Sequence, residues 1–117
     1  MLLQDVIKFL NAQILTGTEL LDRRVCDCYG SDMMSEVLAY CNSNSLICTG
    51  LTNRQVVRTA YMTELAAIVF VCDKRPCAAV IEEAKENGLP LLVTELTIQE
   101  ACTALQRAGL KSCRKGA

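Results

Sequence analysis

LICTGLTNRQ, residues 46–55, joins a short apolar run to an amphipathic segment through a single glycine. The apolar run is typical of a buried strand, and Thr52 with Gln55 three residues later fits a capping box in which Thr52 is the N-cap of a helix. A strand that turns directly into a helix is the repeating unit of α/β proteins, whose ligands bind at such turns. The stretch therefore predicts an α/β fold and the position of a binding crevice.

The rest of the chain repeats this alternation of helical and aliphatic segments. Apolar residues at helical spacing predict helices at residues 3–10, 34–41, 56–61, 77–84 and 98–105. Aliphatic runs at residues 14–15, 46–48, 67–71 and 91–93 separate these segments, and residues 25–28 are interpreted as a further strand at an edge. The last three runs lack the alternation of a half-exposed strand, which indicates strands covered on both faces. We therefore expect a three-layer α/β/α sandwich with a mostly parallel sheet.

Length and charge restrict the class of protein. The 117 residues fit one domain, which we place at residues 1–110, and residues 111–117 are predicted to be a basic flexible tail. The 12 Lys and Arg residues are balanced by 13 Asp and Glu residues, so nucleic acid and anionic membranes are not expected partners. Without a signal-peptide pattern or a run of about 20 apolar residues, the chain is expected to be cytoplasmic.

The candidate ligand site lies where three predicted strands end. Parallel strands deliver their carboxyl ends to one edge of the sheet, and the N–H groups of the helices that begin there favour anions. Thr97 with Glu100 fits a second capping box at this edge. We expect a small ligand containing a phosphate or a nucleotide to contact Gly50, Thr52, Asn53, Arg54, Asp73, Thr94 and Thr97.

Catalytic and metal sites have little support. The sequence contains no histidine, which excludes a Ser-His or Cys-His pair, and no spacing marks a carboxylate dyad, so no catalytic residue, metal or cofactor is predicted. Five cysteines fall in apolar stripes or strands and are interpreted as small core residues: Cys41, Cys48, Cys72, Cys77 and Cys102. Cys26 and Cys28 are two apart in a strand, so both thiols are expected on one side of the sheet.

Several stretches together resemble the DRTGG domain family: residues 30–35, Gly50 to Asn53 entering the segment 55–60, the strand at 67–71, and residues 86–94 with Thr97. The resemblance implies a fold similar to the N-terminal domain of HPr kinase/phosphorylase, and a regulatory or ligand-sensing role. The chain departs from the family signature twice. Leu51-Thr52 stands where the Asp-Arg pair would follow the glycine, and Val71-Cys72-Asp73 stands where Thr-Gly-Gly would close the next strand.

Three functions remain open at this point. The first is a non-catalytic regulatory or interaction domain, expected to be a homodimer, that binds a small anionic ligand or a partner protein along the crevice. The second is a redox or metal accessory protein that works through Cys26 and Cys28. The third, suggested by fold analogy alone, is an enzyme that acts on a nucleotide-linked substrate.

Overall fold

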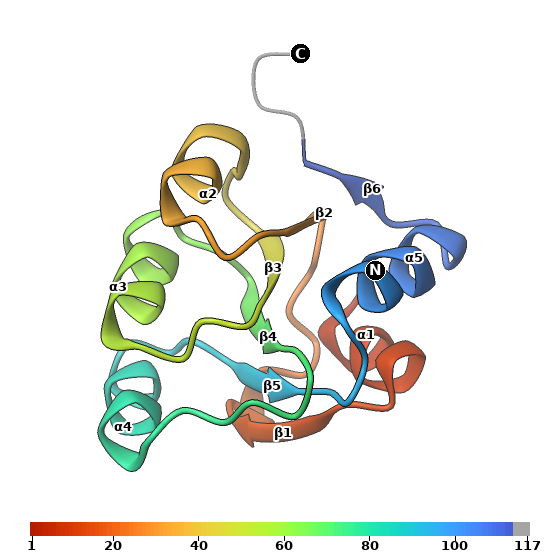
Figure 1. The fold of residues 1–117 in the computed structure, drawn as a ribbon. Helices are drawn as coiled ribbons and strands as arrows, with labels where there is room; N and C mark the ends of the chain where they lie inside the picture. The colour runs from red at the N-terminus through yellow and green to blue at the C-terminus, as the bar shows by residue number, and fades with distance from the viewer. Residues whose placement is uncertain (114–117) are drawn as a thin grey trace.

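The computed structural model describes residues 1–113, in which a six-stranded sheet lies between two layers of helices (Figure 1). Along the chain the elements are α1 (Leu3–Leu10), β1 (Gln13–Thr16), a 3-10 turn (Thr18–Leu20), β2 (Asp27–Gly30), α2 (Met34–Tyr40), β3 (Ser45–Thr49), α3 (Arg54–Met62), β4 (Ala67–Phe70), α4 (Ala78–Glu86), β5 (Leu91–Val93), α5 (Ile98–Arg107) and β6 (Lys111–Ser112). The predicted three-layer α/β/α architecture is confirmed.

The sheet has the strand order β1-β5-β4-β3-β2-β6. Only β1 runs antiparallel to its neighbour, and the pairs that join β6, β2, β3, β4 and β5 are all parallel. The three strands that carry the predicted crevice are therefore adjacent and run in the same direction. Their carboxyl ends meet at one edge of the sheet, as the alternation of strands and helices predicted.

Each face of the sheet has its own core. On one face α2, α3 and α4 pack around Ile47, Ile68 and Phe70, and on the other α1 and α5 pack around Leu46, Val69 and Leu92. Because helices cover both faces, every residue of β3, β4 and β5 is buried. This explains why these strands read as continuous apolar runs.

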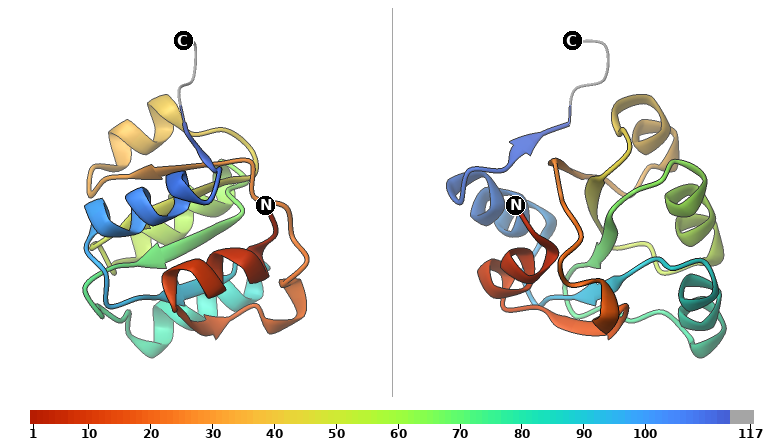
Figure 2. Two further views of the ribbon diagram at one scale, coloured as in Figure 1. Left: turned by 90° about the vertical axis from the view of Figure 1, so that its right-hand side faces the viewer. Right: turned by 180° about the vertical axis from the view of Figure 1, so that it is seen from behind.

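The end of the chain differs from the predicted tail. Lys111 and Ser112 pair in parallel with Asp27 and Cys28, and the next residue, Cys113, is buried (Figure 2). The prediction of a flexible tail is wrong for these three residues, and its remaining residues, 114–117, lie outside the described part of the chain. Since β6 forms the outer strand, the strand predicted at an edge, β2, lies inside the sheet.

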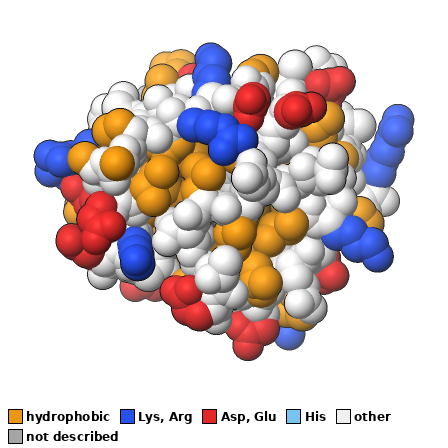
Figure 3. Space-filling view, turned by 90° about the horizontal axis from the view of Figure 1, so that it is seen from below, with side chains coloured by type: hydrophobic (Ala, Val, Ile, Leu, Met, Phe, Trp, Pro, Cys, Tyr) orange, Lys and Arg blue, Asp and Glu red, His pale blue; other side chains and the backbone are white. Residues whose placement is uncertain are grey.

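The surface carries charges of both signs. The face shown in Figure 3 mixes basic and acidic side chains around small apolar areas, in keeping with a net charge of −1. Within residues 1–113, no helix has the length and apolar character that crossing a bilayer requires.

Candidate functional site

The loops that follow β2, β3, β4 and β5 form a rim at one end of the molecule, on the left of the left-hand view in Figure 2. We call these loops, residues 31–33, 50–53, 71–77 and 94–97, the carboxyl rim. In open α/β sheets this is the edge at which ligands bind.

Asp32 joins two loops of the carboxyl rim. Its Oδ1 atom accepts a hydrogen bond from the backbone N–H of Gly50 at 2.6 Å and another from the hydroxyl of Thr49 at 3.0 Å. The Thr49 hydroxyl in turn accepts from the N–H of Leu51 at 3.2 Å. The carboxylate thus holds the end of β3 against the loop after β2, and fixes the backbone around Gly50.

Lys74 places a positive charge beside Gly50. A Cβ atom added at Gly50 would lie 3.2 Å from Lys74 Nζ and 3.4 Å from Asp32 Oδ1, so the missing side chain leaves the space that this ammonium group borders. Among residues 1–113, no carboxylate oxygen lies within 4.0 Å of the ammonium. The rim therefore holds a cation whose charge is not neutralised by direct contact with a described carboxylate.

A strained turn after β4 brings Lys74 to this position. Cys72 and Asp73 have φ angles of 56° and 55°, a left-handed backbone that side chains disfavour. Two hydrogen bonds hold the turn: the N–H of Cys72 donates to the Leu96 carbonyl and the N–H of Asp73 to the Thr94 carbonyl, both at 2.8 Å. Backbone strain of this kind is concentrated at functional sites.

The first turn of α3 completes this part of the rim. Asn53 is the N-cap, because its side chain accepts a hydrogen bond from the N–H of Val56 at 3.2 Å. The prediction of Thr52 as the N-cap is wrong by one residue. Within residues 1–113, the N–H groups of Thr52 and Asn53 donate to no hydrogen-bond acceptor, and the positive end of the helix dipole lies beside them.

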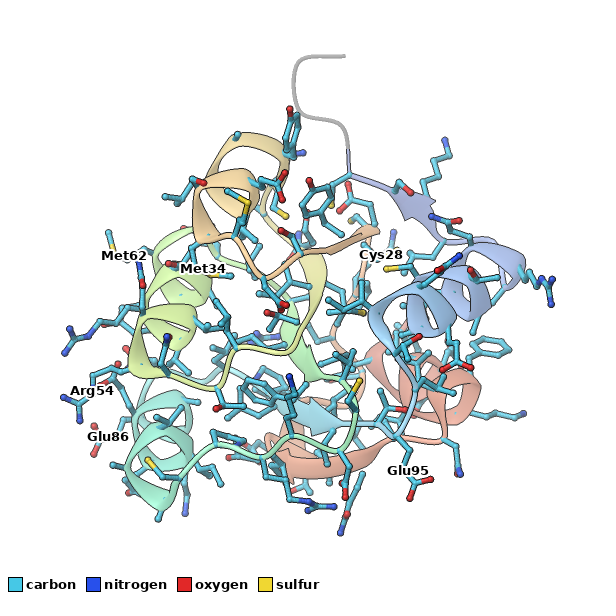
Figure 4. All side chains as sticks on the ribbon, viewed as in Figure 1. Cys28, Met34, Arg54, Met62, Glu86 and Glu95 are labelled. Atoms are coloured by element: carbon cyan, nitrogen blue, oxygen red, sulfur yellow. The ribbon has the colours of Figure 1, made fainter. Side chains whose placement is uncertain are left out.

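Three of the predicted site residues are engaged in other contacts. Arg54 points away from the sheet toward α4 (Figure 4), where its Nε atom pairs with Glu83 at 3.1 Å. Thr94 is buried, and its hydroxyl donates to the Leu10 carbonyl at 2.8 Å. Thr97 caps α5 through the predicted capping box with Glu100, at 3.1 Å and 2.9 Å.

A separate hollow of about 200 Å³ lies between the loops after β4 and β5 and the end of α1. Asp73, Arg75 and Thr94 are among its lining residues. Here the guanidinium of Arg75 is already paired with the Asp73 carboxylate at 3.1 Å and donates to Gln13 at 2.8 Å. The basic side chain of this hollow is thus neutralised, unlike Lys74.

Asp32 and Lys74 were absent from the predicted set of site residues. Asp32 follows a strand that the sequence indicated only weakly, and Lys74 adjoins the predicted Asp73. A signal was available for both, since each lies in a loop that follows a strand whose carboxyl end lies at the same edge. The sequence did not show which side chain of each loop turns toward Gly50.

The cysteines divide into buried and exposed groups. Cys41 and Cys48 are buried as predicted, whereas Cys72 and Cys77 are exposed, so their assignment to the core is wrong. Hydrogen bonds from the N–H groups of Val80 and Ala79 at the start of α4 lower the pKa of Cys77, and Arg54 adds to this effect.

The two thiols that the sequence paired, Cys26 and Cys28, lie in different surroundings. Cys26 is exposed and precedes β2, while Cys28 is buried within it. Among residues 1–113, no three His, Cys, Asp or Glu side chains are grouped so that they would hold a metal ion.

A sequence profile of the DRTGG domain matches residues 5–108, which is most of the chain. The chain belongs to the DRTGG domain family. No protein with curated annotation matches it.

A solved structure confirms the DRTGG fold. The CBS and DRTGG domains of the regulatory region of Clostridium perfringens pyrophosphatase, complexed with the activator diadenosine tetraphosphate, are similar to this chain with a TM-score of 0.67 and 12% identity. The match covers 88% of this chain but only 45% of the other, so the DRTGG chain spans about half of that regulatory region.

The departure from the DRTGG signature coincides with the strained turn. Cys72 and Asp73 stand at the positions where the family pattern has two glycines, and both adopt the left-handed backbone that glycine tolerates. A turn that glycine would adopt without strain is therefore formed here by two residues that carry side chains. The family's Asp-Arg pair is replaced by Leu51-Thr52, so Lys74 is the basic residue nearest to Gly50 on the described rim.

Proposed function

We propose that this DRTGG domain is a non-catalytic regulatory domain that binds a small phosphate-containing ligand at the carboxyl rim. The Lys74 ammonium and the N–H groups of Thr52 and Asn53 would contact the phosphate. The observation that carries the proposal is the Lys74 ammonium, which lies beside the backbone of Gly50 and forms no ion pair with a carboxylate of residues 1–113.

The chemistry of these groups favours a phosphate. A lysine ammonium is a compact charge that binds phosphate oxygens, and free N–H groups at a helix N-terminus add donors and a positive potential. Gly50 supports close approach, because it presents no side chain to a ligand that lies over the backbone. The N–H groups and the ammonium belong to neighbouring loops of the rim, after β3 and β4 respectively.

A regulatory role rather than a catalytic one is supported by the contacts that the acidic side chains of the rim already make. The carboxylate of Asp32 accepts two hydrogen bonds from β3 and its loop, and that of Asp73 pairs with Arg75. These carboxylates hold loops in place. The regulatory region of the pyrophosphatase, which shares the fold and is complexed with a nucleotide activator, is consistent with the same role here.

Isothermal titration and thermal shift at low salt would test the ligand. The probes are inorganic phosphate, ATP and diadenosine tetraphosphate, with adenosine as the uncharged control. We expect at least one phosphate compound to raise the Tm, and Lys74→Ala to weaken its binding about tenfold, which is about 1.4 kcal/mol. Lys85→Ala, which removes an exposed lysine from the last turn of α4, should bind like the parent protein.

Gly50→Ala provides a second, independent variant. Its new methyl group would meet the flexible end of Lys74 at 3.2 Å, so the ammonium must move while the backbone stays in place. We expect weaker phosphate binding with almost unchanged stability. The proposal is wrong if no phosphate compound binds, or if Lys74→Ala and Lys85→Ala bind equally well.

A further inference from the structure

Three thiols form a cluster between α5 and the sheet, and the proposed ligand site does not use them. Cys28 in β2 and Cys48 in β3 are buried, at 1% and 0% exposure. Cys102 in α5 packs against the same core and remains partly exposed to solvent. In Figure 4 the labelled Cys28 lies on the side of the sheet that faces α5.

Gly30 creates the space in which the Cys102 sulfur lies. A Cβ atom added at Gly30 would be 2.7 Å from Cys102 Sγ and 2.5 Å from a methyl carbon of Ile98, so no side chain fits there. Gly30 pairs with Cys48 across the β2–β3 ladder. Cys28 precedes Gly30 by two residues and thus shares its face of the sheet.

Cys102 is the thiol of the cluster that an oxidant in solution can reach, because the other two are buried. Hydrogen bonds from the thiols of Cys28 and Cys48 lower the pKa of Cys102. The same contacts, together with burial, raise the pKa of Cys28 and of Cys48. The lowered pKa thus falls on the one cysteine of the three that solvent reaches, and the buried Cys28 belongs to the same core, which is an arrangement suited to a redox-sensitive pair.

We propose that Cys102 and Cys28 are an oxidation site at which hydrogen peroxide produces a disulfide between α5 and β2. The Cys102 thiolate attacks one peroxide oxygen, which breaks the O–O bond, releases hydroxide and leaves a sulfenic acid. The Cys28 sulfur then attacks Cys102 Sγ, the S–O bond breaks, and the Cys28 proton and the departing hydroxide form water. The hydroxide released in the first step takes up the proton that Cys102 lost when it ionised, so in total two thiols lose two electrons and two protons, and one peroxide becomes two waters.

Cys28, rather than Cys48, is the partner because β2 is less constrained than β3. A disulfide requires an S–S distance of about 2.0 Å, so one strand or the helix must shift. On its outer side β2 is held only by the two residues of β6, whereas β3 is held on both sides by the longer pairings with β2 and β4. We therefore expect β2, which has fewer pairing hydrogen bonds on its outer side, to move toward α5 more easily than β3.

Peptide mapping of the full chain tests this site. The protein is treated with hydrogen peroxide, unfolded in an alkylating reagent, and digested with trypsin and chymotrypsin. Tryptic cleavage releases Cys102 in residues 86–107, which contain no other cysteine, and chymotryptic cleavage after Tyr29 separates Cys28 from Cys48. We expect the peptide that contains Cys102 to be recovered in a disulfide-linked pair with the segment that contains Cys28.

Two variants assign the partner within that segment. Cys26→Ser changes the neighbouring exposed cysteine and should leave the linked pair intact. Cys28→Ser should abolish it and leave Cys102 to oxidise further to the sulfinic acid. The proposal is overturned if the oxidised parent protein yields Cys102 alkylated or sulfinic but unlinked, or if Cys102 is linked to Cys48 or Cys26. The parent protein alone shows whether Cys102 is linked to residues 25–29, to Cys48 or to neither, so this part of the test does not depend on the folding of a variant.

Discussion

At the level of single residues, the turn after β4 shows how a strained backbone positions a charged side chain. Cys72 and Asp73 both adopt positive φ, and each such residue costs about 1 kcal/mol or more relative to glycine or a relaxed backbone. Hydrogen bonds to the carbonyls of Leu96 and Thr94 hold the two residues in this conformation. The result is that Lys74, the next residue, borders Gly50.

Replacing Cys72 with glycine should relieve part of this strain. Cys72 is exposed and its N–H bond does not involve the side chain, so Cys72→Gly removes no core contact. We expect the free energy of unfolding to rise by about 0.5 kcal/mol. Glycine adopts positive φ without steric cost, and this gain is larger than the loss of stability caused by the greater conformational entropy of glycine in the unfolded chain. Denaturant unfolding would measure the change. Cys26→Gly, at an exposed cysteine without positive φ, should instead lower stability, and a loss of similar size in both variants would contradict the strain argument.

At the level of secondary structure, the start of α5 connects the rim to the core. The capping box of Thr97 and Glu100 satisfies two N–H groups, and one turn later Ala101 and Leu105 pack against the sheet. The loop after β5 therefore enters α5 in one orientation. That orientation also places Cys102 over Gly30.

Loss of this cap should destabilise the protein measurably. Thr97→Ala removes the acceptor for the Glu100 N–H, and we expect the free energy of unfolding to fall by about 1 kcal/mol. Thr103→Ala is the matched control, since Thr103 is exposed within the same helix and alanine is the better helix former there. Thermal unfolding of the two variants checks this prediction. Equal stability of Thr97→Ala and the parent protein would show that the cap contributes nothing.

At the level of the whole molecule, exposed apolar side chains gather at α2 and the end of α3. Met33, Leu38 and Tyr40 are 59%, 50% and 43% exposed, and Met62 at the end of α3 is 74% exposed. The contacts between α2 and α3 place these side chains on neighbouring elements. Such surface is typical of an interface between subunits.

We expect the protein to form a homodimer through this surface. Light scattering after size exclusion, at about 100 µM protein, should give twice the chain mass of 12.8 kDa. Leu38→Glu should shift the protein to the monomer, because it places a charge in the interface. Phe9→Glu, which alters a similarly exposed residue on α1 at the other face of the sheet, should not. A monomeric parent protein at this concentration would rule the dimer out.

The order and type of the elements follow from the sequence alone. Helical spacing placed the five helices to within a few residues, and continuous apolar runs indicated buried parallel strands, because both signals arise from neighbours along the chain. The predicted rim at the carboxyl ends of β3, β4 and β5 follows from parallel pairing. Local signals failed at two places. Thr52 and Asn53 are adjacent and both suit the N-cap position of α3, and β6 has only two residues.

The contacts that give the rim and the thiol cluster their chemistry were decided by the tertiary structure. Asp32 and Gly50 are 18 residues apart, and the helix that brings Cys102 over Gly30 begins more than 60 residues after that glycine. Nothing in a local pattern specifies which loop residue turns inward when distant segments pack. Sequence therefore determined where the carboxyl ends of the parallel strands meet, whereas the packing of four loops and one helix determined that Lys74 borders Gly50 and that three cysteines share one face.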